Sequence, residues 1–144
     1  EKIKARLSEV MPAGIEIHDV YTAKTKPSDA AYAENEITWV HGSYTAETCA
    51  AIEEYFRHPV IMMKKSKSGE KEVDVTDFVR SLTARIENGC LIVTAVCNAN
   101  QENYLNPSYI VAAIEREFDV TGENGYHTIC RKRLLCEDGV TDFR

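Results

Sequence analysis

Two groups of cationic residues in this chain are dense enough to bind a polyanion. The first group lies within residues 57–71, where the only acid is Glu70. It consists of Arg57, Lys64, Lys65, Lys67 and Lys71. The second is the uninterrupted run Arg131, Lys132 and Arg133. Because each Lys or Arg that contacts a phosphate adds salt-dependent affinity, these residues form the candidate nucleic-acid-binding set. A solvated strand edge, whose lysines only prevent aggregation, is the alternative.

Cysteine and histidine spacing predicts neither a metal site nor an iron-sulfur cluster. The 5 cysteines are spread along the chain without a C-x-x-C pair, which is typical of reduced thiols, and most are expected to be small core residues. Cys130 and Cys136 flank the second basic run, where cations would lower a thiol pKa, but burial on a strand is the favoured interpretation. No two of the 4 histidines have metal-ligand spacing, so surface or turn roles are expected. We predict no metal, no cofactor and a cytoplasmic location.

Other motifs do not predict a catalytic site. Glu34 and Glu36 share one face of an expected strand, where paired carboxylates would divide acid and base work only if their environments differed. We expect them to be solvated acids. The run His41-Gly42-Ser43 lacks the G-x-S-x-G elbow of a serine hydrolase, and the glycines form no phosphate-binding pattern. No catalytic residue is predicted, and whether the protein is an enzyme is left open.

The composition is that of a soluble globular chain. Of its 144 residues, 44% are hydrophobic and 28% are charged, and the net charge is -6. This charge opposes nonspecific attraction to nucleic acid or anionic membrane over the whole surface, so the two basic groups are local exceptions. No apolar run approaches the roughly 20 residues that span a bilayer, and no membrane contact is predicted.

Hydrophobic periodicity and turn residues predict the elements that position these side chains. Helices are expected over 1–11, 46–56 and 107–118, with Thr45 and Asn106 as caps. Strands are expected over 15–21, 31–40, 82–87, 91–97 and 126–135, and Asn88-Gly89 predicts a tight hairpin turn. Residues 60–75 predict a further hairpin whose tip is basic. The tail 137–144 has no period and is expected to be loose.

The order of elements predicts an α+β fold. From residue 31 it is βαββαβ with an inserted hairpin, which indicates a ferredoxin-like antiparallel sheet with both helices on one face. Residues 1–27 then resemble the closing helix and strand of a preceding unit plus a loop, and 28–136 form the ferredoxin-like domain. Together with the absence of Met at position 1, this favours a fragment of a longer protein. Because 81–87 and 90–97 contain no aromatic residue, the sheet lacks the stacking surface of an RNA-recognition motif.

Several short motifs resemble the later part of a bacterial family called radical-SAM-linked, a domain of unknown function. They are the runs 11–17 (MPAGIEI), 28–34 (SDAAYAE) and 71–75 (KEVDV) before Phe78-Val79, then Asn106-Pro107 and the segment from Ile129 to Leu134. Where the family has an Arg-Pro step, this chain has Thr76-Asp77. The resemblance implies a domain beside, or fused to, a cobalamin-type radical-SAM protein, sometimes with RNA-processing functions. It also implies an absent front half, and without cluster cysteines this chain would not itself be the radical enzyme.

Three functions remain open on this basis. The first is a noncatalytic accessory domain that helps a radical-SAM partner to bind or position an RNA or protein substrate. The second is a small-ligand or enzymatic site formed with the missing N-terminal half and using residues such as His18, Glu34 or Arg131. The third is a self-association module in which sheet edges pair. The oligomeric state is not predicted.

Overall fold

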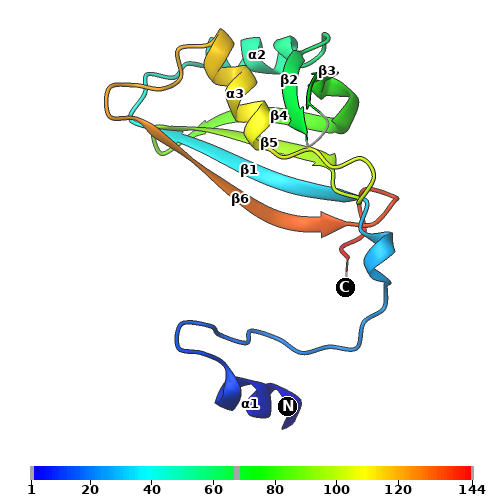
Figure 1. Ribbon diagram of the computed structural model, residues 1–144. Helices are drawn as coiled ribbons and strands as arrows, with labels where there is room; N and C mark the ends of the chain where they lie inside the picture. Colours follow the sequence, from blue (N-terminus) through cyan, green and yellow to red (C-terminus); the bar gives the residue numbers. More distant parts are fainter. Residues whose placement is uncertain (1, 67–68, 144) are drawn as a thin grey trace.

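The computed structural model describes residues 2–66 and 69–143. The regular elements, drawn in Figure 1, are α1 (Lys2–Val10), the short 3-10 helix η1 (Pro27–Asp29), β1 (Tyr32–Val40), α2 (Ala46–Tyr55), β2 (Ile61–Ser66), β3 (Gly69–Asp74), the 3-10 helix η2 (Val75–Phe78), β4 (Val79–Glu87), β5 (Cys90–Asn98), α3 (Ser108–Glu117) and β6 (Tyr126–Leu135). None of the helices in these ranges is long and apolar enough to cross a membrane.

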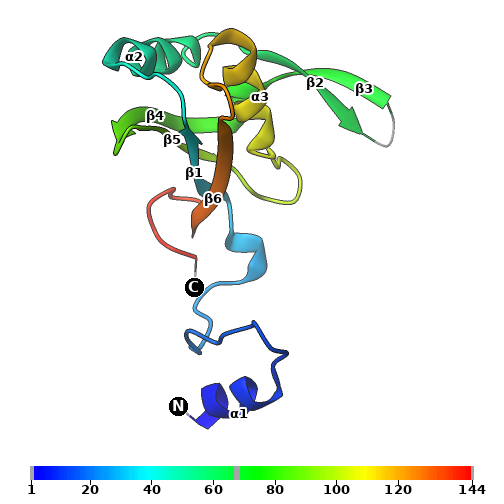
Figure 2. The same ribbon diagram turned by 90° about the vertical axis from the view of Figure 1, so that its left-hand side faces the viewer.

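Four strands form the main sheet in the order β4-β5-β1-β6, and every neighbouring pair is antiparallel. α2 and α3 both lie on one face of this sheet (Figures 1 and 2). The chain passes from β1 through α2 and the β2–β3 hairpin to β4, and from β5 through α3 to β6. The predicted α+β class with an antiparallel sheet is therefore confirmed. The narrower assignment to the ferredoxin-like fold stays a prediction.

The core lies between the sheet and the two helices. Trp39 and Leu91 of the sheet pack in one buried cluster with Ile52 of α2 and Ile114 of α3, and all four are fully buried. Burial of each such side chain stabilises the fold by about 1.5–3 kcal/mol. β1 alternates strictly between buried and half-buried positions, as its sequence predicts. This alternation also gives the sheet a second face, the open face, on which Glu36 lies.

Local signals define the start of α2 and the turn between β4 and β5 as predicted, whereas α3 begins at Ser108, one residue later than predicted, with Pro107 in place of Asn106 at its N-cap. The Thr45 hydroxyl accepts a 3.2 Å hydrogen bond from the amide of Thr48 and so caps α2. Asn88 and Gly89 have φ angles of 51° and 75°, the left-handed pair that a two-residue hairpin turn requires. They form the predicted tight turn between β4 and β5, and Glu87 pairs with Cys90 across it.

The β2–β3 hairpin is a separate two-stranded sheet that projects from the body (Figure 2). Its base is closed by Asp74, whose carboxylate accepts hydrogen bonds from the amides of Val60 and Thr76 (both 3.0 Å) and from the Thr76 hydroxyl (2.6 Å). Burial acts to raise the pKa of Asp74, but these hydrogen bonds outweigh it and the pKa lies below its ordinary value. The predicted hairpin over 60–75 is thus present, with Lys67 outside the described residues.

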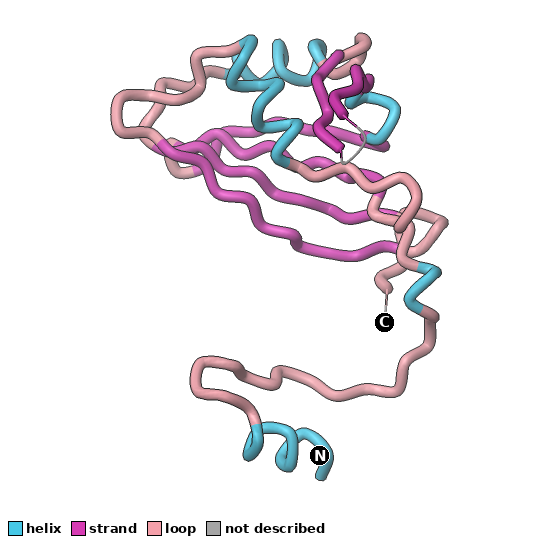
Figure 3. The backbone as a smooth tube through the Cα atoms, viewed as in Figure 1, coloured by secondary structure: helices cyan, strands magenta, loops and turns pink. Residues whose placement is uncertain are grey.

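The strand predicted over 15–21 is wrong, because this segment has no regular structure. Figure 3 shows residues 11–26 as a loop between α1 and η1 that runs apart from the sheet. A strand needs a neighbour whose N–H and C=O groups pair with its own, and no strand in the described ranges pairs with this segment. Ile15 and Tyr21 stay exposed, at 57% and 58%, and Ile17 is half-buried.

The tail also differs from its prediction, because residues 137–143 fold back on β6 instead of hanging free. The Asp138 carboxylate accepts hydrogen bonds from the amides of Val140 and Thr141 (both 2.9 Å), which closes a turn. Asp142 then pairs with Leu135 as an isolated antiparallel bridge. A short polar side chain that satisfies turn amides orders this segment without any hydrophobic period.

Candidate nucleic-acid interface

The hairpin gathers three of the predicted cations on two facing strands. Lys64 of β2 stands opposite Lys71 of β3, and Lys65 stands opposite Glu70. The Lys65 ammonium lies 3.4 Å from the Glu70 carboxylate, so this pair is neutralised. Two like charges directly opposite each other on a hairpin repel, so the Lys64–Lys71 pair opposes pairing of the strands unless an anion lies beside it.

Lys64 is directed away from the hairpin toward the loop that precedes α3. Its ammonium donates a 3.3 Å hydrogen bond to the backbone carbonyl of Tyr104 and lies 5.6 Å from the centre of the Phe78 ring. Lys71 makes no ion pair with any of the described residues. The hairpin therefore presents one cation held against the body and one that has no acidic partner in the described chain.

Arg57 is engaged at the end of α2. Its guanidinium forms a 2.8 Å ion pair with Glu54, and the His58 ring lies 3.2 Å from the second oxygen of the same carboxylate. Both partners are exposed, and an ion pair of this kind contributes little to stability. Arg57 thus belongs to a local cluster on α2 and not to the hairpin strands.

The three cations of β6 do not form one patch. Arg131 stands opposite Asn35, on the face of the sheet that carries the helices. Lys132 occupies an irregularity in the β1–β6 register, and its ammonium lies 3.6 Å from Glu36 on the open face. Strand alternation and this bulge therefore send neighbouring cations to opposite faces.

Arg133 lies on the open face, as Lys132 does, and so is also separated from Arg131. It stands opposite Glu34, whose carboxylate lies 3.9 Å from its guanidinium, and it forms a shorter 2.6 Å ion pair with Asp142. Glu34 and Arg131 consequently lie on opposite faces of the sheet. The fold therefore does not bring these two side chains together in one site.

Arg131 instead lines a shallow groove between β6 and the loop before α3. We call this the Tyr104 groove; its volume is about 280 Å³, and it is lined by Ala33, Asn35, Tyr104, Asn106, Pro107, Ile129 and Arg131. Tyr104 is 49% exposed, whereas the next residue, Leu105, is only 2% exposed. Because Lys64 bonds to Tyr104, the hairpin and Arg131 approach the same loop from two sides.

Sequence reasoning missed this groove. Tyr104 lies in a polar stretch that has no period, and Asn35 interrupts an otherwise apolar strand face. An aromatic residue in a polar connection and an amide on a buried strand face are the signals that would have found them. Neither signal indicates which segments of the chain meet.

The carboxylates of the open face are ion-paired. Arg85 of β4 donates to Glu36 (3.0 Å), to the Thr94 hydroxyl (3.0 Å) and to Glu87 (3.3 Å). The hydrogen bond from Arg85 is the main cause that lowers the pKa of Glu36, and Lys132 adds to it. A carboxylate held charged in this way is unsuited to donate or remove protons near neutral pH. The expected solvated acids are thus part of a charge network.

The cysteines are less buried than expected. Cys49 and Cys97 are buried, Cys90 and Cys136 are half-buried, and Cys130 is exposed. Burial raises the pKa of the Cys97 thiol to about 12. The predicted burial is wrong for Cys130, because β6 is an edge strand and Cys130 stands opposite Glu36 on the open face.

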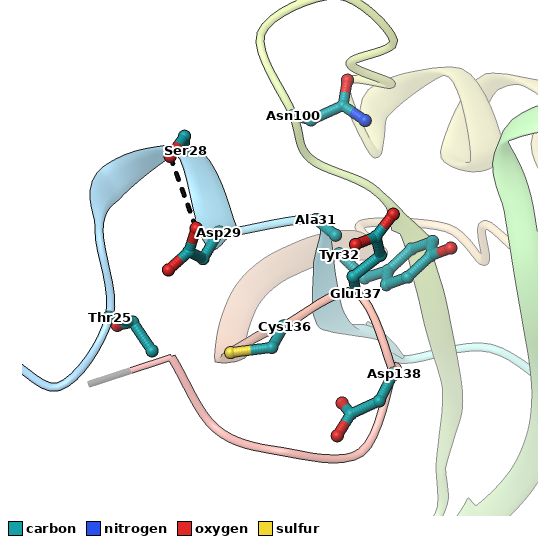
Figure 4. Close-up of a pocket in the computed structure, with 9 residues that line it drawn as sticks. All are labelled: Thr25, Ser28, Asp29, Ala31, Tyr32, Asn100, Cys136, Glu137 and Asp138. Atoms are coloured by element: carbon teal, nitrogen blue, oxygen red, sulfur yellow. Dashed lines mark hydrogen bonds between the residues drawn. The ribbon is translucent and has the colours of Figure 1, made fainter.

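Cys136 lies in a larger, polar hollow of about 490 Å³ where η1 meets the tail (Figure 4). It is lined by Thr25, Ser28, Asp29, Ala31, Tyr32, Asn100, Cys136, Glu137 and Asp138. Burial raises the pKa of the Cys136 thiol, and the charges of Asp138, Asp29 and Asp142 raise it further. The thiol is therefore not activated as a nucleophile, and three lining carboxylates give the hollow the wrong charge for phosphate.

His127 has a structural partner that its sequence does not suggest. Its Nδ1 lies 2.9 Å from a carboxylate oxygen of Glu115, and that oxygen also accepts a 2.9 Å hydrogen bond from the buried Trp39 indole. These contacts tie α3 to β6 and β1. No group of three or more potential metal ligands occurs in the part of the chain that the structure describes.

The fold and this surface define an α+β domain with a projecting two-stranded hairpin that carries lysines and a groove lined by Tyr104. Residues 1–107 match a family described as uncharacterised proteins conserved in bacteria (DUF2344), and the chain belongs to this family. The matched range contains α1, α2, the hairpin, β1, β4, β5 and Tyr104, and it ends before α3 and β6. No curated protein and no solved structure matches the chain.

Proposed function

We propose that this domain is a noncatalytic accessory domain that binds RNA through the hairpin lysines and Arg131 and positions it for a radical-SAM partner protein. The observation that carries the RNA part is the convergence of two cationic segments on one loop: Lys64 bonds to Tyr104, and Arg131 lines the groove beside it. The radical-SAM part rests on the family resemblance. A cytoplasmic location belongs to the same proposal.

The distribution of charge favours a polyanion over a protein surface. The whole chain has a net charge of -6, so it repels nucleic acid except where cations are concentrated. Lys71 and Arg131 have no acidic partner in the described chain, and Lys64 and Lys71 stand directly opposite each other. A row of phosphates would relieve this repulsion, and each contact would release counterions.

The accessory role is supported by the state of the groups that might otherwise react. Glu36 is held charged by Arg85, and the pKa of the Cys136 thiol is raised. Groups in these states would contribute to binding and folding more readily than to proton transfer or covalent chemistry. The chemistry would then reside in the partner.

Fluorescence anisotropy of labelled single-stranded RNA, at about 50 and 200 mM salt, tests the RNA part. The wild-type chain should bind, and the variant in which Lys64, Lys65 and Lys71 are changed to Gln should show a salt slope smaller by up to about 2, since each lost phosphate contact removes about 0.7. The matched control changes Lys2, Arg6 and Lys24 to Gln. It makes the same change in net charge on an exposed segment that Figure 1 shows apart from the hairpin.

Two results would overturn this part of the proposal. One is no binding by the wild-type chain at the lower salt concentration, and the other is an equal loss in the hairpin variant and the control. Equal losses would mean that only net charge matters and that the hairpin is not the RNA surface.

Coexpression with a cobalamin-type radical-SAM protein, the partner that the resemblance implies, tests the partner part. The two chains should copurify and form a complex of defined mass by light scattering. A complex that forms but binds no RNA would favour a protein substrate instead. Sedimentation of the chain alone, over a range of concentrations, would show whether sheet edges pair into a dimer.

A further inference from the structure

We propose that the Tyr104 groove seats one unpaired nucleotide, with its base against the Tyr104 ring and its phosphate on Arg131. This inference rests on the proposed function and deepens it, because it names the unit of RNA that is recognised and the side chains that recognise it. The hairpin then supplies charge, and the groove supplies contact with a base.

The Tyr104 side chain is exposed, and the peptide group that joins it to Leu105 is hydrogen-bonded at both its N–H and its C=O. Leu105 is buried, and its amide donates a 3.1 Å hydrogen bond to the carbonyl of Asn98. Lys64 holds the carbonyl of Tyr104 itself. None of the aromatic pairs within the described ranges includes the Tyr104 ring. A held, exposed ring without an aromatic neighbour is a stacking platform, and every base has a face that can stack on it.

Arg131 is the cation of β6 without an acidic partner in the described chain. Lys132 lies 3.6 Å from Glu36 and Arg133 lies 2.6 Å from Asp142, so both are neutralised on the open face. The planar guanidinium of arginine matches two oxygens of a phosphate. Arg131 and Tyr104 line the same groove, so one groove combines a phosphate-binding residue with an aromatic residue.

Two amides complete the groove. Asn35 is 4% exposed and is the buried polar residue of the described core, where its amide donates to the carbonyl of Ala33 (3.2 Å). The carbonyl oxygen of the Asn106 side chain accepts from the amide of Ser108 (3.0 Å), which leaves its NH₂ group available. Amides are the groups that bind base edges.

Stacking and pairing within a duplex favour an unpaired base as the ligand of the groove. The groove has a volume of about 280 Å³ and is lined by Tyr104 of the loop before α3 and by Arg131 of β6. A base inside a duplex is stacked on both faces and has its pairing edge occupied, so it would have to leave the helix to reach the ring. A single-stranded segment avoids this cost.

Binding of a short fluorescein-labelled single-stranded RNA tests the inference. Tyr104→Ala should weaken binding roughly five- to a hundredfold with the salt slope unchanged, because a stacking contact and not a phosphate contact is lost. Tyr104→Phe keeps the ring and should bind within about twofold of wild type. Arg131→Gln should weaken binding and lower the slope by about 0.7, whereas Lys132→Gln, on the open face, should do neither.

Site-resolved crosslinking gives a second readout that does not depend on substituted proteins. RNA that contains 5-bromouridine, irradiated with the wild-type chain, should attach to the peptide that carries Tyr104. Attachment only at other peptides overturns the inference, as does binding of a duplex of the same sequence that is equally tight and equally sensitive to Tyr104→Ala.

The outcomes separate the inference from the proposed function. One outcome is that the wild-type chain binds RNA and the hairpin variant binds it more weakly, while Tyr104→Ala binds it as tightly as wild type. In that case nucleotide binding in the Tyr104 groove is wrong and the proposed function stands. If the wild-type chain binds no single-stranded RNA at the lower salt concentration, both are wrong. If Tyr104→Ala weakens DNA of the same sequence to the same extent, nucleotide binding in the Tyr104 groove stands and does not distinguish RNA from DNA.

Discussion

The ammonium group of Lys64 donates a 3.3 Å hydrogen bond to the backbone carbonyl of Tyr104, 40 residues away in the sequence. This contact joins the projecting hairpin to the loop that leads into α3. It directs the Lys64 ammonium away from Lys71, although the two residues are paired in the register of the hairpin. The contact thus links the charged part of the proposed RNA surface to its aromatic part.

The substitution Lys64→Met tests this link. Met keeps an apolar stem of similar length but cannot donate, so the hairpin should lose its tie to the loop. Because the bond is exposed, the free energy of unfolding should change by no more than about 1 kcal/mol. Amide hydrogen exchange in the loop 99–107 should become faster. Lys71→Met is the control, since Lys71 has no partner in the described chain, and unchanged loop exchange in both variants would contradict the prediction.

Loss of the Glu115 carboxylate should destabilise the domain through Trp39. The Trp39 side chain is fully buried, and its indole N–H donates to Glu115 over 2.9 Å. In Glu115→Ala that donor has lost its acceptor, which costs about 1–3 kcal/mol. Urea unfolding followed by fluorescence reports this change directly, because the chain has 1 tryptophan.

The matched control for this prediction is Glu117→Ala, which removes a carboxylate from the exposed side of the same helix. Its unfolding free energy should stay within about 0.5 kcal/mol of wild type. Equal destabilisation by both substitutions would mean that helix charge and not the Trp39 hydrogen bond is responsible.

Two isoleucines on helices should respond very differently to truncation. Ile52 of α2 is fully buried, whereas Ile3 of α1 is 64% exposed. Ile52→Ala should lower the free energy of unfolding by about 2–5 kcal/mol because it leaves a cavity between helix and sheet. Ile3→Ala should change it by less than about 0.5 kcal/mol. A large effect at Ile3 in denaturant titrations of the same chain would show that α1 packs against the domain.

The turn in the tail should open as the pH falls. The Thr141 hydroxyl is the main cause that lowers the pKa of Asp138 to about 2, and the amides of Val140 and Thr141 add to it. A depressed carboxyl pKa stabilises the ordered turn above the ordinary value near 4, and this stabilisation is lost as the pH falls through about 2.

Carboxyl carbon NMR shifts measure this titration for Asp138 itself. The midpoint should lie at about 2, well below the ordinary aspartate value. In Asp138→Asn the acid-dependent change in the amide shifts of Val140 and Thr141 should disappear. A midpoint for Asp138 near 4 would contradict the ordered turn.

Local sequence signals determined most of the elements of this protein. The alternation of apolar and polar residues predicted β1, the Asn88-Gly89 pair predicted the β4–β5 turn, and Thr45 predicted the start of α2. Each of these features depends on residues a few positions apart in the sequence. The order of the elements was sufficient to predict an antiparallel α+β fold. The basic residues were also visible as two groups.

Only the tertiary structure decided how those elements and charges are arranged. Alternation and a register shift separate Arg131 from Lys132, and the approach of two distant segments brings Lys64 to Tyr104. The segment 15–21 has a strand-like pattern but no pairing partner, so it forms no strand. The physical reason is common to all three: faces, pairing and proximity depend on contacts between residues far apart in the sequence, which local periodicity does not encode.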